Sequence, residues 1–272
     1  MSILVSSISV PFQKGEAAAI ELALRRAGVK KPKSVYIVKS SVDARRRSDI
    51  KFVYTVGIEC DHEEEVVLRA KDSNVRIRKS HLPEFVPGER KLPTRPVVIG
   101  FGPAGMFAAL TLARLGYAPL VLERGGDVDS RVAAVEGFWK GGSFDTRSNV
   151  QFGEGGAGTF SDGKLTTRIN DPLCETVLEI FAAHGADPSI LKKAKPHIGT
   201  DYLRRVVKSI REEIIRLGGE VRFNTQVTGF STQSGRITAV RTEAGEVPAE
   251  TVILAVGRIK PMMPIILDFT GR

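Results

Sequence analysis

The sequence is poor in cysteine. Its 272 residues include two cysteines, Cys60 and Cys174, which lie far apart and form no C-x-x-C motif. Without paired thiols at short spacing, the sequence indicates neither a dithiol redox centre nor a zinc site. We therefore expect both cysteines to be core thiols, and we expect no metal centre.

The sequence also lacks a long hydrophobic run. No stretch reaches the length that a helix needs to span a bilayer. The N-terminal stretch MSILVSSISVPF has no basic residue before its apolar residues and is interrupted by Pro11, which is not typical of a signal peptide. The sequence therefore predicts a cytoplasmic protein without a membrane span.

Acidic residues are outnumbered, with 31 Asp and Glu against 40 Lys and Arg, so the formal net charge is +9. The basic excess lies mainly before residue 95. Such a balance would suit an anionic cofactor, RNA or a membrane surface. The cluster Arg45, Arg46, Arg47 and Lys51 could contact phosphate. A solvated hairpin tip explains it better, so a nucleic-acid partner is the less favoured interpretation. The alternative is an RNA-associated protein that uses this basic N-terminal domain.

What remains is the composition of a soluble globular protein, with 42% hydrophobic and 26% charged residues. Residues 1–82 show alternating and helical patterns in the order βαββαβ, which predicts a ferredoxin-like α+β domain. The expected elements are strands at 3–10, 34–39, 51–59 and 74–78 and helices at 16–27 and 63–70. Pro83, Pro87 and Pro93 with Gly88 predict a linker over residues 83–95.

The region 97–125, VVIGFGPAGMFAALTLARLGYAPLVLERG, contains the strongest motif. A β-branched strand at 97–99 runs into Gly100, Gly102 and Gly105, the G-x-G-x-x-G of a dinucleotide site. Pro103 and Ala104 fill the two intervening positions, and a helix is expected over 106–115. The helix N-terminus would face the phosphates, which is why the glycine turn must open directly into a helix.

A second strand, 119–122, ends at Glu123, about twenty residues beyond the first glycines, where a carboxylate can accept hydrogen bonds from ribose hydroxyls. Glu123 argues against a 2′-phosphate at this position, whereas Arg124 beside it weakens that argument. Arg131, in a helix expected over 128–139, is interpreted either as a ligand of the pyrophosphate or as a surface charge. These residues by themselves do not choose between FAD and NAD.

A second glycine-rich loop, QFGEGGAGTFSDGKL, covers residues 151–165. Gly155 and Gly156 lie at its centre, and their amides can form an anion-binding concavity. We expect this loop to lie against the cofactor; the alternative is a tight corner that contacts no ligand. Lys164 in this loop and His197, in a turn next to Gly199, are candidate catalytic groups, although a solvated charge and a structural histidine are the simpler interpretations.

The remainder continues the α/β pattern. Thr200 is expected to be the N-cap of a long helix, and small residues at Ala255 and Gly257 would let another chain segment approach the nucleotide. The further elements expected are helices at 171–183 and 201–217, a third parallel strand at 220–223, an antiparallel meander at 226–230, 236–242 and 246–249, and a returning strand at 251–256.

Together, GFGPAG, LERG, FGEGGAGTFSDGKL, KPHIGTD and ILAVG resemble the glutathione-reductase-like flavoproteins. More narrowly, the chain is similar to bacterial FAD-dependent dehydrogenases of the NAD(P)/FAD-dependent oxidoreductase family. The resemblance implies a Rossmann-like FAD-binding domain over residues 96–272, with part of a substrate domain inserted at about 140–219. It implies FAD as cofactor and leaves NAD(P)H as a candidate electron donor.

By this resemblance, Gly100, Gly102 and Gly105 hold the FAD pyrophosphate and Glu123 the adenosine ribose. Gly155 and Gly156 would lie beside the flavin, Val227 would bond the adenine through its backbone, and Ala255 to Gly257 would border the ribose and pyrophosphate. The family's small-molecule substrate is undefined, so no catalytic residue is implied. Members continue well beyond the strand at 251–256, and we expect residues 258–272 to belong to a shortened C-terminus. The alternative to an active oxidoreductase is therefore a truncated nucleotide-binding fragment without catalytic activity.

Overall fold

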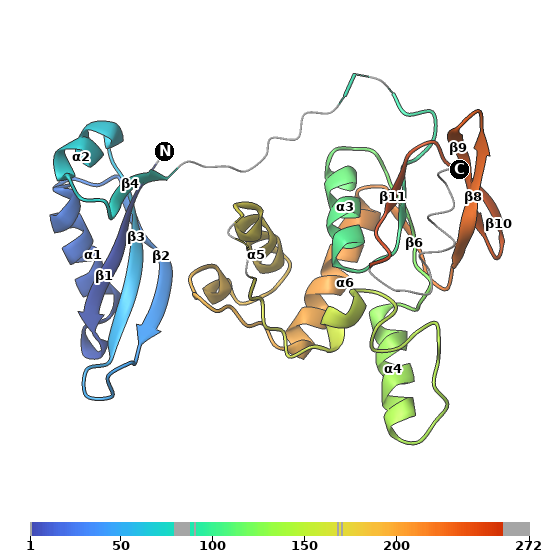
Figure 1. The fold of residues 1–272 in the computed structure, drawn as a ribbon, viewed down its shortest axis with the longest axis horizontal. Helices are drawn as coiled ribbons and strands as arrows, with labels where there is room; N and C mark the ends of the chain where they lie inside the picture. The colour runs from blue at the N-terminus through green and yellow to red at the C-terminus, as the bar shows by residue number, and fades with distance from the viewer. Residues whose placement is uncertain (1, 79–87, 90, 168, 170, 258–272) are drawn as a thin grey trace. The chain divides into compact units, whose positions relative to one another are not determined.

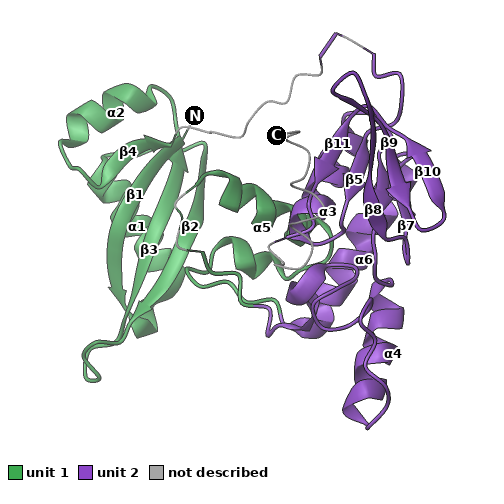
Figure 2. Cartoon of the chain, turned by 45° about the vertical axis from the view of Figure 1, so that its right-hand side comes forward, with its two compact units in different colours: residues 1–84, 164–198 green, residues 85–163, 199–272 purple. Residues whose placement is uncertain are grey.

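A computed structural model of the chain describes residues 2–78, 88–89, 91–167, 169 and 171–257. The chain divides into two compact units, residues 1–84 with 164–198 (unit 1) and residues 85–163 with 199–272 (unit 2), coloured separately in Figure 2. Part of the predicted linker, namely residues 83–87 and 90, lies outside the described residues, as does the segment 258–272.

Unit 1 contains a four-stranded antiparallel sheet in the order β2-β3-β1-β4, with its helices α1 and α2 packed against it (Figure 1). The bounds are β1 Ser2–Pro11, α1 Gly15–Ala27, β2 Ser34–Asp43, β3 Lys51–Glu59, α2 Glu63–Ala70 and β4 Val75–Arg78, with a 3-10 turn η1 at Phe12–Lys14. This sheet order confirms the predicted ferredoxin-like arrangement.

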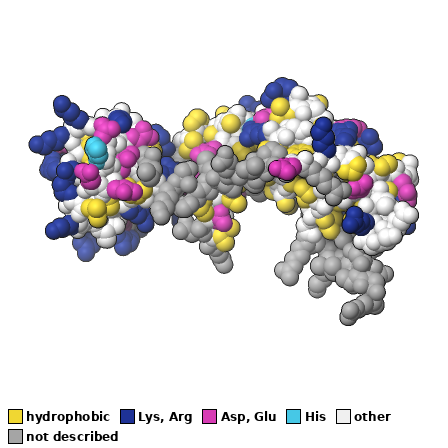
Figure 3. Space-filling model, turned by 90° about the horizontal axis from the view of Figure 1, so that it is seen from above, with side chains coloured by type: hydrophobic (Ala, Val, Ile, Leu, Met, Phe, Trp, Pro, Cys, Tyr) yellow, Lys and Arg dark blue, Asp and Glu magenta, His cyan; other side chains and the backbone are white. Residues whose placement is uncertain are grey.

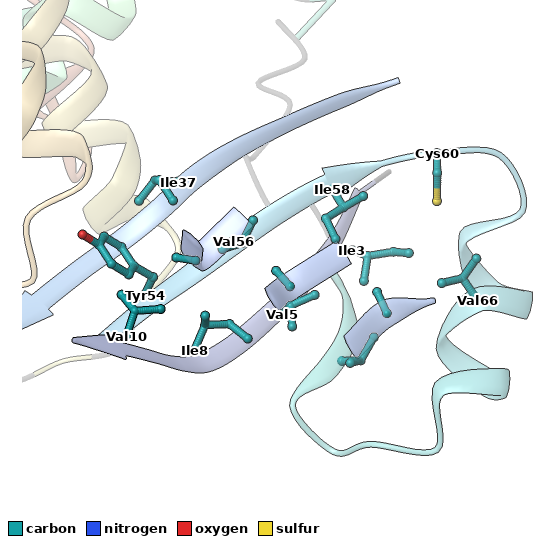
Figure 4. Packing of buried hydrophobic residues seen from close by; sticks show 14 residues of the cluster. Ile3, Val5, Ile8, Val10, Ile37, Tyr54, Val56, Ile58, Cys60 and Val66 are labelled. Atoms are coloured by element: carbon teal, nitrogen blue, oxygen red, sulfur yellow. The ribbon is translucent and has the colours of Figure 1, made fainter. Parts of the chain in front are cut away.

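The core of unit 1 depends on a β-bulge in β1. Ile3 and Val5 are buried before the bulge and Ile8 and Val10 after it, so the register shift between Val5 and Ile8 keeps four apolar side chains on one face. Figure 4 shows these side chains among those of β2 and β3. Helix α1 adds alanines spaced by four residues, which let it pack closely on the sheet: Ala19, Ala23 and Ala27.

Unit 1 also holds helix α5, Leu173–Ala183, and the 3-10 turn η3, Pro188–Leu191. The chain after η3 adds to the edge of β2, where the Ser40 amide donates to the Lys192 carbonyl at 2.6 Å and the Ala194 amide to the Ser40 carbonyl at 3.0 Å. An ion pair of 2.6 Å joins Arg78 of β4 to Glu175 of α5. The segment 164–198 is therefore tied to the first sheet by backbone and side-chain contacts.

Unit 2 has a parallel sheet in the order β11-β5-β6-β7 and an antiparallel meander in the order β10-β9-β8, which confirms both predicted sheets. The strands are β5 Val97–Ile99, β6 Leu120–Leu122, β7 Glu220–Arg222, β8 Val227–Gln233, β9 Arg236–Thr242, β10 Gly245–Pro248 and β11 Val252–Leu254. The helices are α3 Pro103–Arg114, α4 Val128–Trp139 and α6 Thr200–Arg216, with a 3-10 turn η2 at Gly156–Phe160.

Unit 2 has three layers, formed by the helices α3 and α6, the parallel sheet and the meander. Alternate side chains of β5 and β6, Val97, Ile99, Leu120 and Leu122, form one buried cluster with apolar residues of the meander. Helices α3 and α6 pack on each other, and Arg114 of α3 bonds both carboxylate oxygens of Glu213 in α6 at 2.9 and 3.1 Å. In Figure 1 the parallel sheet lies between α3 and the meander.

One predicted cap is wrong. The N-cap of α6 is Gly199, and Thr200 is already the first helical residue. The Thr200 hydroxyl instead donates to the Ser161 carbonyl at 2.7 Å, which anchors the helix start to the end of the second glycine-rich loop.

Among the described helices, none combines the length and apolar character that crossing a bilayer would require.

Candidate nucleotide-binding cleft

A cleft of about 820 Å³ lies in unit 2 where the carboxyl ends of β5, β6 and β11 meet. This edge of a parallel sheet is the usual position of a ligand in α/β proteins. The lining residues are Ile99, Gly100, Gly102, Pro103, Ala104, Leu122, Glu123, Arg124, Gln151, Phe152, Gly153, Gly156, Ala157, Thr225, Gln226, Val227, Leu254, Ala255, Val256 and Gly257.

The three glycines of the turn have different reasons to be glycine. Gly100 has φ +96°, and a Cβ there would lie 2.7 Å from the Ala255 carbonyl oxygen. A Cβ on Gly105 would collide with the carbonyl oxygen of Gly100. Gly102 differs, because it lines the cleft and a Cβ there would meet nothing within 4 Å. Gly100 and Gly105 serve packing, whereas Gly102 leaves space in the cleft.

The N-terminus of α3 opens at the same place. Its N-cap is Gly102 and its first residue is Pro103, and no side chain of the described residues caps it. The first turn also contains no acidic residue. Uncapped amides and the positive end of the helix dipole favour an anion here.

Glu123 is 6% exposed and lines the cleft. Its two carboxylate oxygens accept hydrogen bonds from the Phe101 amide at 2.6 Å and from the Gly125 amide at 2.8 Å. The side chain thus links the glycine turn to the end of β6. Each carboxylate oxygen has a second lone-pair direction, so the group can still accept a hydroxyl donor.

Phe152 is a lining residue that the sequence motifs did not single out as a ligand contact. The Arg124 guanidinium lies 3.8 Å from the centre of its ring, and both residues line the cleft. A guanidinium stacked on an aromatic ring presents a flat surface to a planar ligand. Thr225 and Gln226, which precede β8, were missed too, because nothing in their local pattern marks them.

The second glycine-rich loop lies beside the glycine turn of residues 100–105. The Gly155 amide donates to the Phe101 carbonyl at 2.8 Å, and a Cβ on Gly156 would lie 3.4 Å from Gly102 Cα. Gly156 lines the cleft, whereas Gly155 is buried beside Thr159 and does not. Ala255 and Gly257 also line the cleft, and the Ala255 amide donates to the Ile99 carbonyl at 2.8 Å.

Arg131 requires a correction. It is fully buried, so it is not a surface charge, and it is not among the lining residues. Its guanidinium donates to backbone carbonyls on both sides of residue 151, those of Asn149 and Val150 and those of Glu154 and Gly156 in the second glycine-rich loop. Burial lowers the pKa of Arg131 to about 10, with the Glu123 and Glu154 charges acting in the opposite direction. Its observed partners are protein groups.

A family model described as a domain of unknown function (DUF8436) matches residues 2–59. An uncharacterized protein of Clostridium beijerinckii is 48% identical over 222 residues, which cover 81% of this chain and 42% of that relative. The chain therefore spans less than half the length of the curated relative that it matches.

Solved structures with some similarity include two oxidoreductases. Glycine oxidase from Bacillus cereus is 16% identical over 59% of this chain and 54% of that chain, with a TM-score of 0.39. Thioredoxin reductase from Streptococcus pyogenes is 20% identical over 61% of this chain and 36% of that chain, with a TM-score of 0.34. At these values neither likeness supports a conclusion about activity.

Lys164 and His197, the two candidate catalytic residues, do come together. They pair in an isolated antiparallel bridge, both are exposed, and both belong to unit 1. Neither is among the residues that line the cleft. The structure thus gives them a shared backbone contact and supplies no further support for a catalytic role.

The basic cluster near the β2–β3 turn is partly neutralised. Arg45 pairs with Asp43 and Lys51 with Asp49, each at 2.6 Å. The hydrogen bond from Arg45 lowers the pKa of Asp43 to about 2. Figure 3 shows acidic side chains among the Lys and Arg side chains of unit 1.

Among the described residues, no cluster of three or more His, Cys, Asp or Glu side chains could hold a metal ion.

Proposed function

We propose that unit 2 binds FAD in this cleft and that the chain is part of an FAD-dependent oxidoreductase acting on a small organic substrate. The observation that carries the proposal is Gly102. It stands at an uncapped helix N-terminus, and the position of its absent Cβ is empty space inside the cleft. This is the arrangement that a pyrophosphate requires, because its oxygens must approach backbone amides closely.

The other lining residues fit the same ligand. Glu123 is available to accept ribose hydroxyls, and its negative charge disfavours a 2′-phosphate. The backbone of Val227 would hold the adenine, while Gly156, Ala255 and Gly257 would allow close contact along the rest of the molecule. FAD, when bound, supplies reversible uptake of an electron pair, and NAD(P)H is the proposed donor.

The residues of this chain would bind and orient the cofactor. The amides at the start of α3 would compensate the phosphate charge, and the Arg124–Phe152 pair would provide a flat surface for a ring. Because the chain spans 42% of its relative, we do not assign the substrate or the groups that act on it to residues of this chain. We propose no proton-transfer residue.

Isothermal titration of the purified chain with FAD and with ADP tests this function. Wild-type protein should bind both, and Gly102→Ala should raise both dissociation constants by more than about tenfold, a loss of about 1.4 kcal/mol. Its melting temperature should stay unchanged, because the new methyl group contacts nothing in the ligand-free chain and the backbone φ of −72° suits alanine.

Gly137→Ala is the matched control. Gly137 is an exposed residue of α4, a Cβ there also meets nothing within 4 Å, and it does not line the cleft. This variant should bind FAD as the wild type does and gain about 0.5–1 kcal/mol in stability, as expected for alanine in a helix. Wild-type protein that binds neither ligand, or equal binding by Gly102→Ala, would refute the proposed function.

A further inference from the structure

Residues 149–156 run from two residues before the second glycine-rich loop into its centre, and this loop lines the cleft beside the glycine turn. Gly153 and Gly156 line the cleft, and the Gly155 amide is bonded to the Phe101 carbonyl at 2.8 Å. Gly156 comes within van der Waals distance of Gly102. A ligand held by the glycine turn would therefore lie against this loop, so the conformation of the loop decides whether the site is formed.

The loop has no regular secondary structure up to residue 155. The Glu154 amide donates to the Gly126 carbonyl and the Gly155 amide to the Phe101 carbonyl, and one guanidinium bonds the loop at several further points. Five hydrogen bonds run from the three nitrogens of Arg131 to carbonyls of Asn149, Val150, Glu154 and Gly156. The distances are 2.8 and 3.2 Å to Asn149, 3.2 Å to Val150 and 3.1 Å to Gly156, and the Glu154 carbonyl is the closest acceptor. A planar fork with five donors suits such convergence, which a lysine cannot reproduce.

Arg131 is itself held in place from several sides. It lies in the first turn of α4, whose N-cap Asp127 accepts from two backbone amides. The Glu154 carboxylate, fully buried, accepts from the Val128 amide at 2.7 Å and lies 3.4 Å from Arg211 Nε of α6. The Phe160 ring centre lies 4.9 Å from the Arg131 guanidinium. The loop, α4 and α6 are thus connected around one buried cation.

From these contacts we infer that Arg131 is a positioning residue for the dinucleotide site proposed above. It holds the second glycine-rich loop in its cleft-lining shape before the ligand arrives, and it does not contact the ligand. Each of its three guanidinium nitrogens donates to at least one of these carbonyls. Because the carbonyl oxygens accept hydrogen bonds from a protein cation, they do not repel a phosphate in the cleft. The inference rests on the proposed function.

Arg131→Lys is the central variant, because it keeps the positive charge and removes the fork. Hydrogen exchange of amides 149–156 should become fast in the ligand-free variant, while exchange in strands β8 and β9 stays as in the wild type. If the loop then occupies its cleft-lining shape about a tenth of the time, the dissociation constant for ADP rises about tenfold. Saturating ADP should restore the slow exchange of the loop.

Arg204→Met is the matched control. Arg204 also lies over the Phe160 ring, at 5.1 Å from its centre, and no hydrogen bond joins it to the described loop 149–156. It should leave both loop exchange and ADP affinity within twofold of the wild type. Should Arg131→Lys fail to fold, Gly153→Ala is the second variant, because its methyl group would overlap the Arg131 side chain. The same fast loop exchange is expected.

The outcomes separate the inference from the proposed function. Wild-type protein that binds no ADP overturns both. Wild-type binding together with slow loop exchange and unchanged ADP affinity in Arg131→Lys overturns the inference alone. Fast exchange throughout unit 2 in Arg131→Lys, or equal loosening of the loop in Arg204→Met, also overturns it, since either would indicate general destabilisation.

Discussion

At the scale of single residues, two buried carboxylates determine the shape of the cleft. Glu123 links the glycine turn to β6 through two backbone amides. Glu154 links the second glycine-rich loop to the first amide of α4 and to Arg211. Both carboxylates therefore have a structural role in the ligand-free protein.

Glu123→Gln should destabilise the protein by about 1–3 kcal/mol, because the amide nitrogen of glutamine would face a backbone N–H that now has an acceptor. Urea unfolding measures this loss. Glu243→Gln is the control, since Glu243 forms an exposed ion pair with Arg147 and should change stability by less than about 1 kcal/mol. Equal stability of the two variants would show that the Phe101 and Gly125 amides do not depend on the Glu123 charge.

The pH dependence of Glu154 provides a second test. Burial raises the pKa of Glu154 above the ordinary value of 4.5, against the opposing charge of Arg211. Because the folded pKa exceeds the unfolded one, the stabilising contribution is fully present below pH 4.5 and is lost as the pH rises through the raised value. The stability advantage of the wild type over Glu154→Gln should therefore shrink between pH 4.5 and neutral pH. An advantage that grows with pH would mean that Arg211 keeps the carboxylate charged.

At the scale of elements, the contact of α3 with β5 depends on Gly105. The first turn of the helix touches the strand end so closely that a Cβ would overlap the Gly100 carbonyl, and the Ala255 side chain lies nearby at 3.4 Å. The small residues thus let three segments, β5, α3 and the end of β11, meet under the cleft.

Gly105→Ala should lower the free energy of unfolding by about 1–3 kcal/mol, as overpacking of a dense site does. Thermal unfolding measures it, with Gly102→Ala as the comparison. Gly105→Ala should mainly lower the stability, whereas Gly102→Ala should mainly weaken ligand binding. A Gly105→Ala protein with wild-type stability would contradict the close packing of helix and strand.

At the scale of the whole molecule, each unit buries apolar residues of its own within the described part of the chain. One apolar cluster lies between the sheet of unit 1 and its helices, and another lies between the parallel sheet and the meander of unit 2. The described residues that line the cleft all belong to unit 2. Ligand binding and unit 1 stability should therefore respond to different changes.

Calorimetry should resolve two unfolding transitions. ADP at a hundredfold excess over its dissociation constant should stabilise one of them by about 2.7 kcal/mol. Val56→Ala, at a fully buried position of β3, should destabilise the other by about 2 kcal/mol. A single transition that both changes shift equally would show that the two units unfold as one.

Much of the fold could be predicted from the sequence because its signals are local. The alternation of Ile3 and Val5, the helical run ending at Gly28 and the glycine turn after Ile99 each depend on neighbouring residues only. The start of α6 could not be predicted to the residue, because the Thr200 hydroxyl bonds Ser161, a partner 39 positions away.

The sequence by itself determined the order of strands and helices, the glycine turn and the carboxylate after β6, since spacing along the chain sets them. Only the tertiary structure decided that Arg131 is buried, that Arg124 stacks on Phe152 and that Gly100 abuts Ala255. Each of these contacts joins segments far apart in the chain. Their geometry depends on how irregular loops close, and loop closure leaves no periodic pattern in the sequence.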